Sequence, residues 1–189
     1  MTSIIVDFAT LDQEQTAAAA RVLRAALSHL PSGYQGPGEA EAEVEMRQHD
    51  PGWLGFAALE KGALVGWIGA LRTYSHGWEV HPLVVAPSHQ RRGIGSALMA
   101  ALETRARAEG VRTLYLGSDD DYGGTTLFGR ELFPGVLAHA AGIEPTERGH
   151  ALTFYRRHGY EIVGLLPDVN GPGRPDIHLA KRLAHRGEE

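Results

Sequence analysis

The stretch Leu83–Leu98, LVVAPSHQRRGIGSAL, decides the fold of this chain. Its apolar first residues predict a buried strand, Pro87 ends that strand, and a loop with two glycines, Gly93 and Gly95, then opens an amphipathic helix. A helix N-terminus presents unbonded backbone N–H groups and the positive end of the helix dipole, and two arginines precede the glycines here. The stretch therefore predicts a site for a pyrophosphate, with an ordinary tight turn that needs positive φ as the alternative.

Two familiar phosphate motifs do not fit this loop. The Walker motif ends in Gly-Lys-Ser/Thr, whereas Gly95 is followed directly by Ser96. The dinucleotide fingerprint needs a third glycine where Leu98 stands, and a first βα unit near the start of the fold. The loop itself therefore leaves the phosphate ligand open.

Outward from this loop, strands and helices interleave without a strict βαβ repeat, which predicts an α/β chain with a mixed (α+β) sheet. The segment 117–149 has weak periodicity, and we expect short helical pieces in it. No repeat or linker interrupts the 189 residues, so 1–189 is predicted to be a single domain. The first predicted helix has Asp12 as its N-cap and runs to Leu27, and further helices are predicted over 39–47, 96–109 and 151–158. Strands are predicted over 3–8, 54–60, 63–72, 79–86, 113–116, 160–166 and 176–183, and 54–60 and 63–72 form a hairpin joined at Lys61-Gly62. Residues 31–38 are predicted to form a loop.

Composition limits the classes of function. With no cysteine, the chain has no disulfide scaffold, no thiolate zinc site and no cysteine nucleophile, and we expect no metal. A net charge of −5 disfavours nucleic acid and mildly favours a cationic partner, although it also fits a plain solubility charge. The N-terminus lacks a signal pattern and no long apolar run follows, so we expect a soluble, cytoplasmic protein that binds no membrane.

The loop belongs to a pattern that is found in a known family. Gln90-Arg91-Arg92-Gly93-Ile94-Gly95 is similar to the Gln/Arg-x-x-Gly-x-Gly/Ala signature of the GCN5-related N-acetyltransferases, and Phe154–Tyr160 resembles their Phe-Tyr-x-x-x-Gly-Phe/Tyr segment. The resemblance implies acetyl-coenzyme A as co-substrate and a mostly antiparallel central sheet, splayed between strands 4 and 5, with helices on both faces. The coenzyme-binding residues that it implies are Leu83, Val84, Val85, Gln90, Arg91, Arg92, Gly93, Ile94, Gly95, Ser96 and Tyr155.

Further segments are similar to the aminoglycoside 6'-N-acetyltransferases. These segments are Gly77–Val85, Tyr115–Asp120 with Gly124–Leu127, and Pro167–Gly171 with Pro175–Ile177. The similarity is weakest before residue 50 and between residues 128 and 150. The resemblance implies direct acetyl transfer to the 6'-amine of an aminoglycoside, and hence antibiotic resistance. It also implies a homodimer, with the 128–150 segment or the C-terminal strands at the interface.

Acetyl transfer needs a neutral amine, and an aliphatic amine is mostly protonated at neutral pH, so a group that takes its proton is useful. Glu79 and His81 lie two apart on a predicted strand and therefore share one face, which Leu83 and Val85 continue toward the glycine loop. The resemblance assigns Glu79 to binding and deprotonating the 6'-amine, with His81 beside it as a second catalytic candidate. The alternatives are a surface carboxylate at a strand end and a histidine bonded into the fold.

The resemblance also assigns Tyr155 as the general acid beside the coenzyme sulfur. A phenol with a pKa of about 10 keeps its proton at neutral pH and can donate it to a thiolate. Helix packing is the alternative for Tyr155, and the expectation for Phe154. The backbone amides of Leu83 and Val85 are expected to pair with the pantetheine arm, and the Val85 amide to polarise the acetyl carbonyl.

An aminoglycoside is a polycation, so its site should be acidic. Asp119, Asp120 and Asp121 are the main substrate-binding candidates, with a solvated loop or cap as the alternative. Tyr34 is a further candidate, because the family uses the loop around it as part of the antibiotic cleft.

Two other groups of residues could border a substrate cleft. The acidic run Glu39–Glu45 spreads its charge around a helix, which predicts a mainly solvated helix that helps to rim the cleft. Core or edge packing is expected for the three tryptophans, at 53, 67 and 78.

The sequence also fits two other functions. The same fold could acetylate another amine, such as a polyamine, an amino sugar or a peptide. The chain could also be an acyl-coenzyme A sensor without activity, which the presence of both Glu79 and Tyr155 disfavours.

Overall fold

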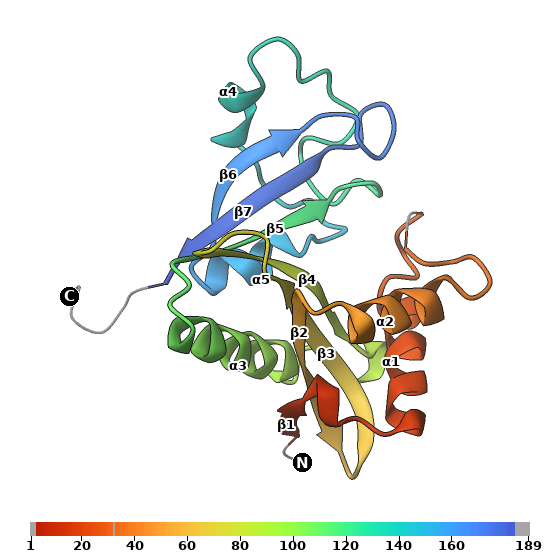
Figure 1. Ribbon diagram of the computed structural model, residues 1–189. Helices are drawn as coiled ribbons and strands as arrows, with labels where there is room; N and C mark the ends of the chain where they lie inside the picture. Colours follow the sequence, from red (N-terminus) through yellow and green to blue (C-terminus); the bar gives the residue numbers. More distant parts are fainter. Residues whose placement is uncertain (1–2, 32, 184–189) are drawn as a thin grey trace. The chain divides into compact units, whose positions relative to one another are not determined.

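The computed structural model describes residues 3–31 and 33–183, so Ser32 of the predicted 31–38 loop lies outside the described residues. The described chain forms two compact units (Figure 1). The N-terminal unit holds residues 3–29, 33–114 and 183, and the C-terminal unit holds 30–31 and 115–182. The single domain expected over 1–189 stays a prediction.

The N-terminal unit contains four antiparallel strands that are neighbours in chain order. They are β1 (Ile4–Asp7), β2 (Trp53–Glu60), β3 (Ala63–Leu71) and β4 (Gly77–Val85). Glu60 lies opposite Ala63, and the two turn residues Lys61 and Gly62 have φ of 51° and 84°. Positive φ at both central positions is the conformation of a type I′ turn, so the predicted hairpin is confirmed.

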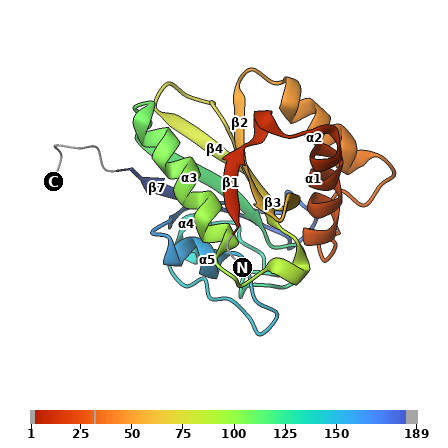
Figure 2. The same ribbon diagram turned by 90° about the horizontal axis from the view of Figure 1, so that it is seen from below.

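Helices cover both faces of these four strands, as expected. Helices α1 (Gln13–Ala26) and α2 (Glu39–His49) lie on one face and α3 (Ile94–Ala108) lies on the other (Figure 2). Short 3-10 turns occur at Phe8–Thr10 (η1) and Pro87–His89 (η2). The predicted N-cap of α1 is confirmed: the Asp12 carboxylate accepts from Gln15 N at 2.8 Å, and Gln15 Oε1 accepts from Asp12 N at 3.1 Å, which is a capping box.

An aromatic cluster forms the centre of the N-terminal unit. The Phe8 ring lies 5.2 Å from the rings of both Trp53 and Trp67, and these three side chains are buried. Buried indoles need acceptors for their N–H groups; Trp67 Nε1 donates to Ala19 O at 3.1 Å, and Trp53 Nε1 donates to His81 O at 3.0 Å. The packing role predicted for these tryptophans, and for the buried Trp78, is confirmed.

The C-terminal unit contains three neighbouring strands in the order β5-β7-β6. These are β5 (Thr113–Asp119, whose first two residues belong to the N-terminal unit), β6 (Glu161–Leu166) and β7 (Asp176–Arg182), and β6 pairs antiparallel with β7. The helices are α4 (Val136–Ala140) and α5 (Leu152–Arg157), and α4 packs on β6. The mixed α/β class is confirmed, and the splay expected between the fourth and fifth strands stays a prediction.

The long segment before α5 is folded although it has little regular secondary structure. Thr126 N donates to Glu144 O at 2.9 Å and Thr146 N donates to Gly124 O at 2.8 Å, which holds two distant parts of the segment together. Its side chains Leu127 and Ile143 are buried. The expected short helical piece is α4. None of the helices described in 3–31 and 33–183 is long and apolar enough to cross a membrane.

Candidate active site

The predicted pyrophosphate loop forms the start of α3. Arg91 and Gly93 both have left-handed backbone, with φ of 58° and 83°. Gly93 is the N-cap of α3, so no side chain bonds to the first N–H groups of the helix from the cap position. The residues Gln90–Gly93 are exposed. A curled, exposed loop at the positive end of a 15-residue helix is suited to bind an anion.

The two arginines of this loop have different surroundings. Arg92 Nη2 lies 2.8 Å from Glu60 Oε1, whereas Arg91 forms no ion pair with any residue in the described part of the chain. Gln90 Nε2 donates to Val85 O at 3.1 Å and thereby ties the loop to the end of β4. Arg91 therefore offers an uncompensated positive charge to a phosphate, and sequence reasoning did not foresee that Glu60 neutralises Arg92.

Strand β4 carries the first catalytic candidates. Glu79, His81, Leu83 and Val85 are half-buried and the residues between them are buried, so the four share the more open face, as expected. Ala70 of β3 pairs with Val80 and Ile68 pairs with Leu83, so β4 holds one extra residue at His81-Pro82. Bulges of this kind re-aim side chains beside active sites. The sequence feature that indicates this bulge is Pro82, because a proline has no backbone N–H to donate to a neighbouring strand.

The Glu79 carboxylate forms no hydrogen bond or ion pair with any residue that the structure describes. It projects from the half-buried face of β4, opposite Leu71 of β3. A partly buried carboxylate without an internal partner is well suited to accept a hydrogen bond from an external cation.

The His81 ring is held by two side chains of the N-terminal unit. Its Nε2 lies 3.3 Å from Tyr34 Oη and 3.2 Å from Glu43 Oε1. Glu43 Oε1 also accepts from Arg47 Nε at 2.7 Å. Burial alone would raise the pKa of Glu43, but the hydrogen bonds from His81 and Arg47 outweigh it and hold that pKa below its ordinary value. The structure thus brings the predicted residues Tyr34 and His81 into direct contact, and it adds Glu43, which was not predicted, as a second partner of the His81 ring.

The prediction of a mainly solvated acidic helix is correct for Glu39, Glu41 and Glu45, which are exposed, and wrong for Glu43, whose side chain is only 9% exposed. Helix α2 buries Ala40, Glu43 and Val44 together. These residues lie at i, i+3 and i+4 on one helix face. The spacing of Ala40 and Val44 in the sequence indicates this buried helix face, and Glu43 lies on it, whereas the other three glutamates lie outside it.

In the C-terminal unit, Asp120 and Asp121 are buried, with 0% and 3% of their surface exposed. The Asp120 carboxylate accepts from Gly124 N at 2.7 Å, from Thr125 N at 2.8 Å and from Thr125 Oγ1 at 2.6 Å. Asp120 therefore caps the turn that follows β5, and this arrangement does not support the substrate contact predicted for it.

Asp119 lies at the end of β5 and is half-buried, next to a second carboxylate that the sequence did not single out. Burial, and then the negative charge of Asp119, raise the pKa of Asp176 at the start of β7. Asp119 Oδ1 accepts from Asn170 Nδ2 at 2.5 Å, and Asp176 Oδ2 lies 3.1 Å from His178 Nε2. Asp176 Oδ1 is buried and has no hydrogen-bond partner among the described residues. This pair of carboxylates can accept an external cation.

Tyr155 lies on α5, where its ring packs 5.4 Å from Phe154 and 5.8 Å from Tyr160. Burial raises the pKa of Tyr155 to about 12. The phenol therefore keeps its proton at neutral pH, as a general acid must before it acts. Phe154 packs against His158 at 4.4 Å, as expected for a packing residue.

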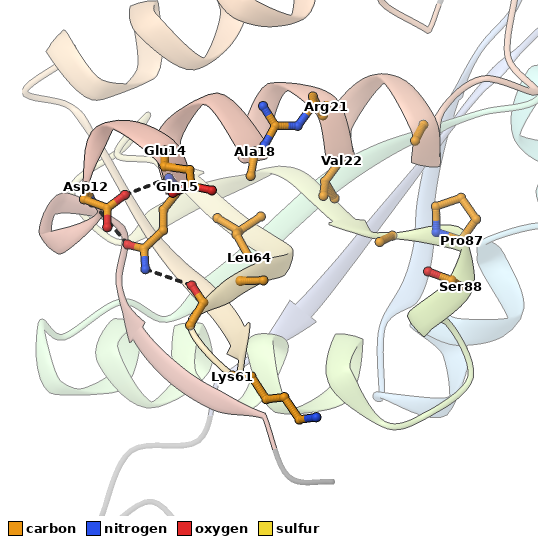
Figure 3. A pocket seen from close by; sticks show the side chains of 14 residues that line it. Asp12, Glu14, Gln15, Ala18, Arg21, Val22, Lys61, Leu64, Pro87 and Ser88 are labelled. Carbon is orange, nitrogen blue, oxygen red and sulfur yellow. Dashed lines mark hydrogen bonds between the residues drawn. The ribbon is translucent and has the colours of Figure 1, made fainter.

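A groove of about 680 Å³ lies in the N-terminal unit (Figure 3). It is lined by α1, by the β2–β3 turn and by Pro87 and Ser88 of η2, and none of the predicted catalytic or substrate-binding residues lines it. Within 3–31 and 33–183, no group of three or more His, Asp or Glu side chains is placed to hold a metal ion.

Comparisons with known proteins agree on one family. Residues 21–124 match the model of the acetyltransferase (GNAT) family. A crystal structure of an aminoglycoside 6'-N-acetyltransferase complexed with coenzyme A is 38% identical over 98% of this chain and 99% of that chain, with a TM-score of 0.86. The aminoglycoside 6'-N-acetyltransferase from Enterococcus faecium is 36% identical over the same shares, with a TM-score of 0.85. An aminoglycoside 6'-acetyltransferase type Ii is 32% identical over 97% and 99%, with a TM-score of 0.72. No curated protein matches.

Proposed function

Because this chain belongs to the GNAT family and is an acetyl-coenzyme A-dependent N-acetyltransferase, we propose that its acceptor is the 6'-amine of an aminoglycoside. The observation that carries the proposal is the similarity to aminoglycoside 6'-N-acetyltransferases over nearly the whole of each chain, well beyond the part that the family model matches. Acetylation removes one positive charge from a polycationic drug, so we propose antibiotic inactivation as the consequence.

The coenzyme supplies the acetyl group as a thioester, and its thiolate is the leaving group. We propose that the loop Gln90–Ser96 holds the pyrophosphate and that the backbone of Leu83–Val85 pairs with the pantetheine arm. The left-handed Gly93 and Arg91, which has no ion pair with any described residue, fit an anion at the loop. The Val85 amide is proposed to polarise the acetyl carbonyl.

Glu79 is proposed to bind the protonated 6'-amine and to take its proton, with His81 as a neighbouring acceptor. Only the neutral amine has a lone pair that can attack the thioester carbonyl. Tyr155 is proposed to donate its phenolic proton to the departing thiolate, which its high pKa allows because the proton is present at neutral pH.

A polycationic acceptor is also supported by the carboxylates of the C-terminal unit. Burial and the negative charge of Asp119 raise the pKa of Asp176, and a bound ammonium group would lower that pKa again. We therefore assign substrate binding to Asp119, with Asp176 as an addition to the predicted set.

A homodimer is proposed as well. The C-terminal unit exposes large apolar side chains within the segment and the strand where the interface is expected: Phe133, Leu137, Val163 and Leu166. Light scattering coupled to size-exclusion chromatography should give twice the mass of the chain, and a single-chain mass at micromolar concentration would contradict the dimer. A cytoplasmic location stays a prediction.

The experiment that tests the proposed acceptor measures thiol release from acetyl-coenzyme A with two matched aminoglycosides, one with a 6'-amine and one with a 6'-hydroxyl. We expect turnover with the amine alone. Equal turnover with both compounds would contradict transfer to the 6'-amine, and turnover only with polyamines or peptide amines would replace the proposed substrate class.

A further inference from the structure

We infer that Glu43 of α2 is a positioning residue of the active site, which fixes the His81 ring with its proton on Nε2 and leaves Nδ1 as the basic atom of the ring. The inference rests on the proposed function of β4, where Glu79 and His81 serve the acceptor amine. It adds a residue from a different element, 38 positions earlier in the chain.

The first step is that Glu43 is an anion in the folded protein. Its side chain is 9% exposed, and a carboxylate buried to this degree needs compensation. Arg47 provides it through an i, i+4 ion pair of 2.7 Å, and the Arg47 side chain is itself 13% exposed. The pKa of Glu43 lies below its ordinary value despite its burial, so the carboxylate is ionised at neutral pH.

The second step is the position of the ring proton. An ionised carboxylate can only accept hydrogen bonds, so the Nε2 atom that lies 3.2 Å from Glu43 Oε1 must carry the hydrogen. Tyr34 Oη, 3.3 Å from the same nitrogen, can share that hydrogen as a second acceptor. A neutral imidazole has one proton, so the lone pair of the ring is on Nδ1.

The third step is access to that lone pair. No residue in the described part of the chain forms a hydrogen bond with His81 Nδ1. The His81 side chain is 37% exposed, so the ring is open to solvent on part of its surface. Nδ1 is therefore the atom that can take a proton from outside, while Nε2 is occupied by the two anchoring side chains.

The anchoring is rigid at both ends. The backbone O of His81 accepts from the buried Trp53 indole at 3.0 Å, so the main chain at the β4 bulge is fixed by the aromatic core. Helix α2 is fixed by the fully buried Ala40 and by Val44, on either side of Glu43. A base that is held in one tautomer and one orientation spends less free energy on reaching the reactive geometry.

The test is the tautomer of His81, observed by long-range 1H–15N correlation spectra of the labelled full chain at a pH where the ring is neutral. The His81→Gln variant assigns the signals. We expect the Nε2–H form in the wild type. In Glu43→Gln the amide can donate to Nε2, so we expect a shift toward the Nδ1–H form, and kcat should fall by roughly ten- to hundredfold with the KM for acetyl-coenzyme A unchanged.

Glu103→Gln is the matched control. Glu103 is also a buried glutamate, with 8% of its side chain exposed, and it pairs with Arg107 at 3.0 Å in the same i, i+4 geometry, but on α3. We expect this variant to keep both the His81 tautomer and kcat. A loss of kcat in Glu103→Gln as large as that in Glu43→Gln would reduce the Glu43 effect to general destabilisation and overturn the inference.

The outcomes separate this inference from the proposed acceptor. An Nδ1–H tautomer in the wild type overturns the inference even if Glu43→Gln does not fold, and so does an unchanged kcat in a Glu43→Gln protein whose tautomer has changed. If aminoglycosides prove inert while the wild-type spectrum shows Nε2–H and Glu43→Gln shifts it, the proposed acceptor fails and the coupling of Glu43 to His81 stands.

Discussion

Gly117 of β5 faces the carboxylate of Asp176 on β7, and a Cβ atom at position 117 would lie 2.3 Å from Asp176 Oδ2. The glycine therefore makes the space in which the Asp176 carboxylate stands beside Asp119. No ordinary contact is as short as this, so a side chain at position 117 would push the carboxylate away.

We predict that Gly117→Ala raises the KM for a cationic acceptor by roughly tenfold, because a displaced carboxylate loses a charge-assisted hydrogen bond to the ammonium group. Steady-state kinetics with a 6'-amino aminoglycoside measures this. Gly164→Ala is the control, since its new Cβ would lie 3.8 Å from the His178 Cβ, an ordinary contact. An unchanged KM in Gly117→Ala would remove Asp176 from the proposed acceptor site.

The two arginines of the glycine loop should differ in their effect on coenzyme binding. Arg91 is unpaired in the described chain and Arg92 is paired with Glu60, so Arg91→Gln should raise the Kd for coenzyme A by roughly tenfold and Arg92→Gln by less. The affinity lost in Arg91→Gln should be smaller at high salt, because salt screens exposed charges. Titration calorimetry at two salt concentrations tests this, and a larger loss in Arg92→Gln would contradict it.

Alkaline unfolding should report the raised pKa of Tyr155. The pKa of Tyr155 is raised to about 12 in the folded protein, whereas a tyrosine in an unfolded chain has a pKa of about 10. Between these values the folded state binds more protons, so the free energy of unfolding is undiminished below about pH 10 and falls by roughly 2 to 3 kcal/mol as the pH rises toward 12.

Denaturant unfolding of Tyr155→Phe from neutral to alkaline pH should show a smaller loss of stability than the wild type. Part of the loss remains, because burial also raises the pKa of Tyr122. Tyr74→Phe, at an exposed position, is the control and should keep the full loss. The same alkaline loss in Tyr155→Phe as in the wild type would mean that folding does not raise the pKa of this phenol.

Turnover should depend on Glu79 while coenzyme binding does not. In Glu79→Gln the side chain keeps its size but cannot take a proton, so kcat should fall by about a hundredfold and the Kd for coenzyme A should stay the same. Glu14→Gln, at an exposed position of α1, is the control and should leave both values unchanged. Full turnover in Glu79→Gln would exclude this residue as the base.

The parts of the fold that local patterns determine could be predicted from the sequence. The capping box at Asp12, the hairpin turn at Lys61-Gly62 and the strand–loop–helix around Gly93 each depend on residues within a few positions of one another. Turn and cap chemistry is local, so its signal is present in the sequence itself.

The residues that were missed depend on distant parts of the chain. The position of Glu43 depends on which face of α2 is buried and on its contact with His81 of β4. The Asp176 carboxylate lies near Asp119 only because β7 is the neighbour of β5 in the sheet. Asp120 looked like an open carboxylate because its partners, Gly124 and Thr125, bond to it through the fold of a turn without regular periodicity. Such pairings need tertiary structure.

The hydrogen bond from Trp53 to the His81 carbonyl has a practical consequence for protein engineering. Phe8 packs edge-on against Trp53, so the 3-10 turn after the first strand supports the indole that bonds to β4, the strand of the proposed catalytic residues. A fusion tag or a truncation that disturbs Phe8 would therefore reach the backbone of His81 through the aromatic core. Expression designs should therefore leave the segment from Ile4 to Thr10 intact, and directed-evolution libraries should vary Phe8 and Trp53 together.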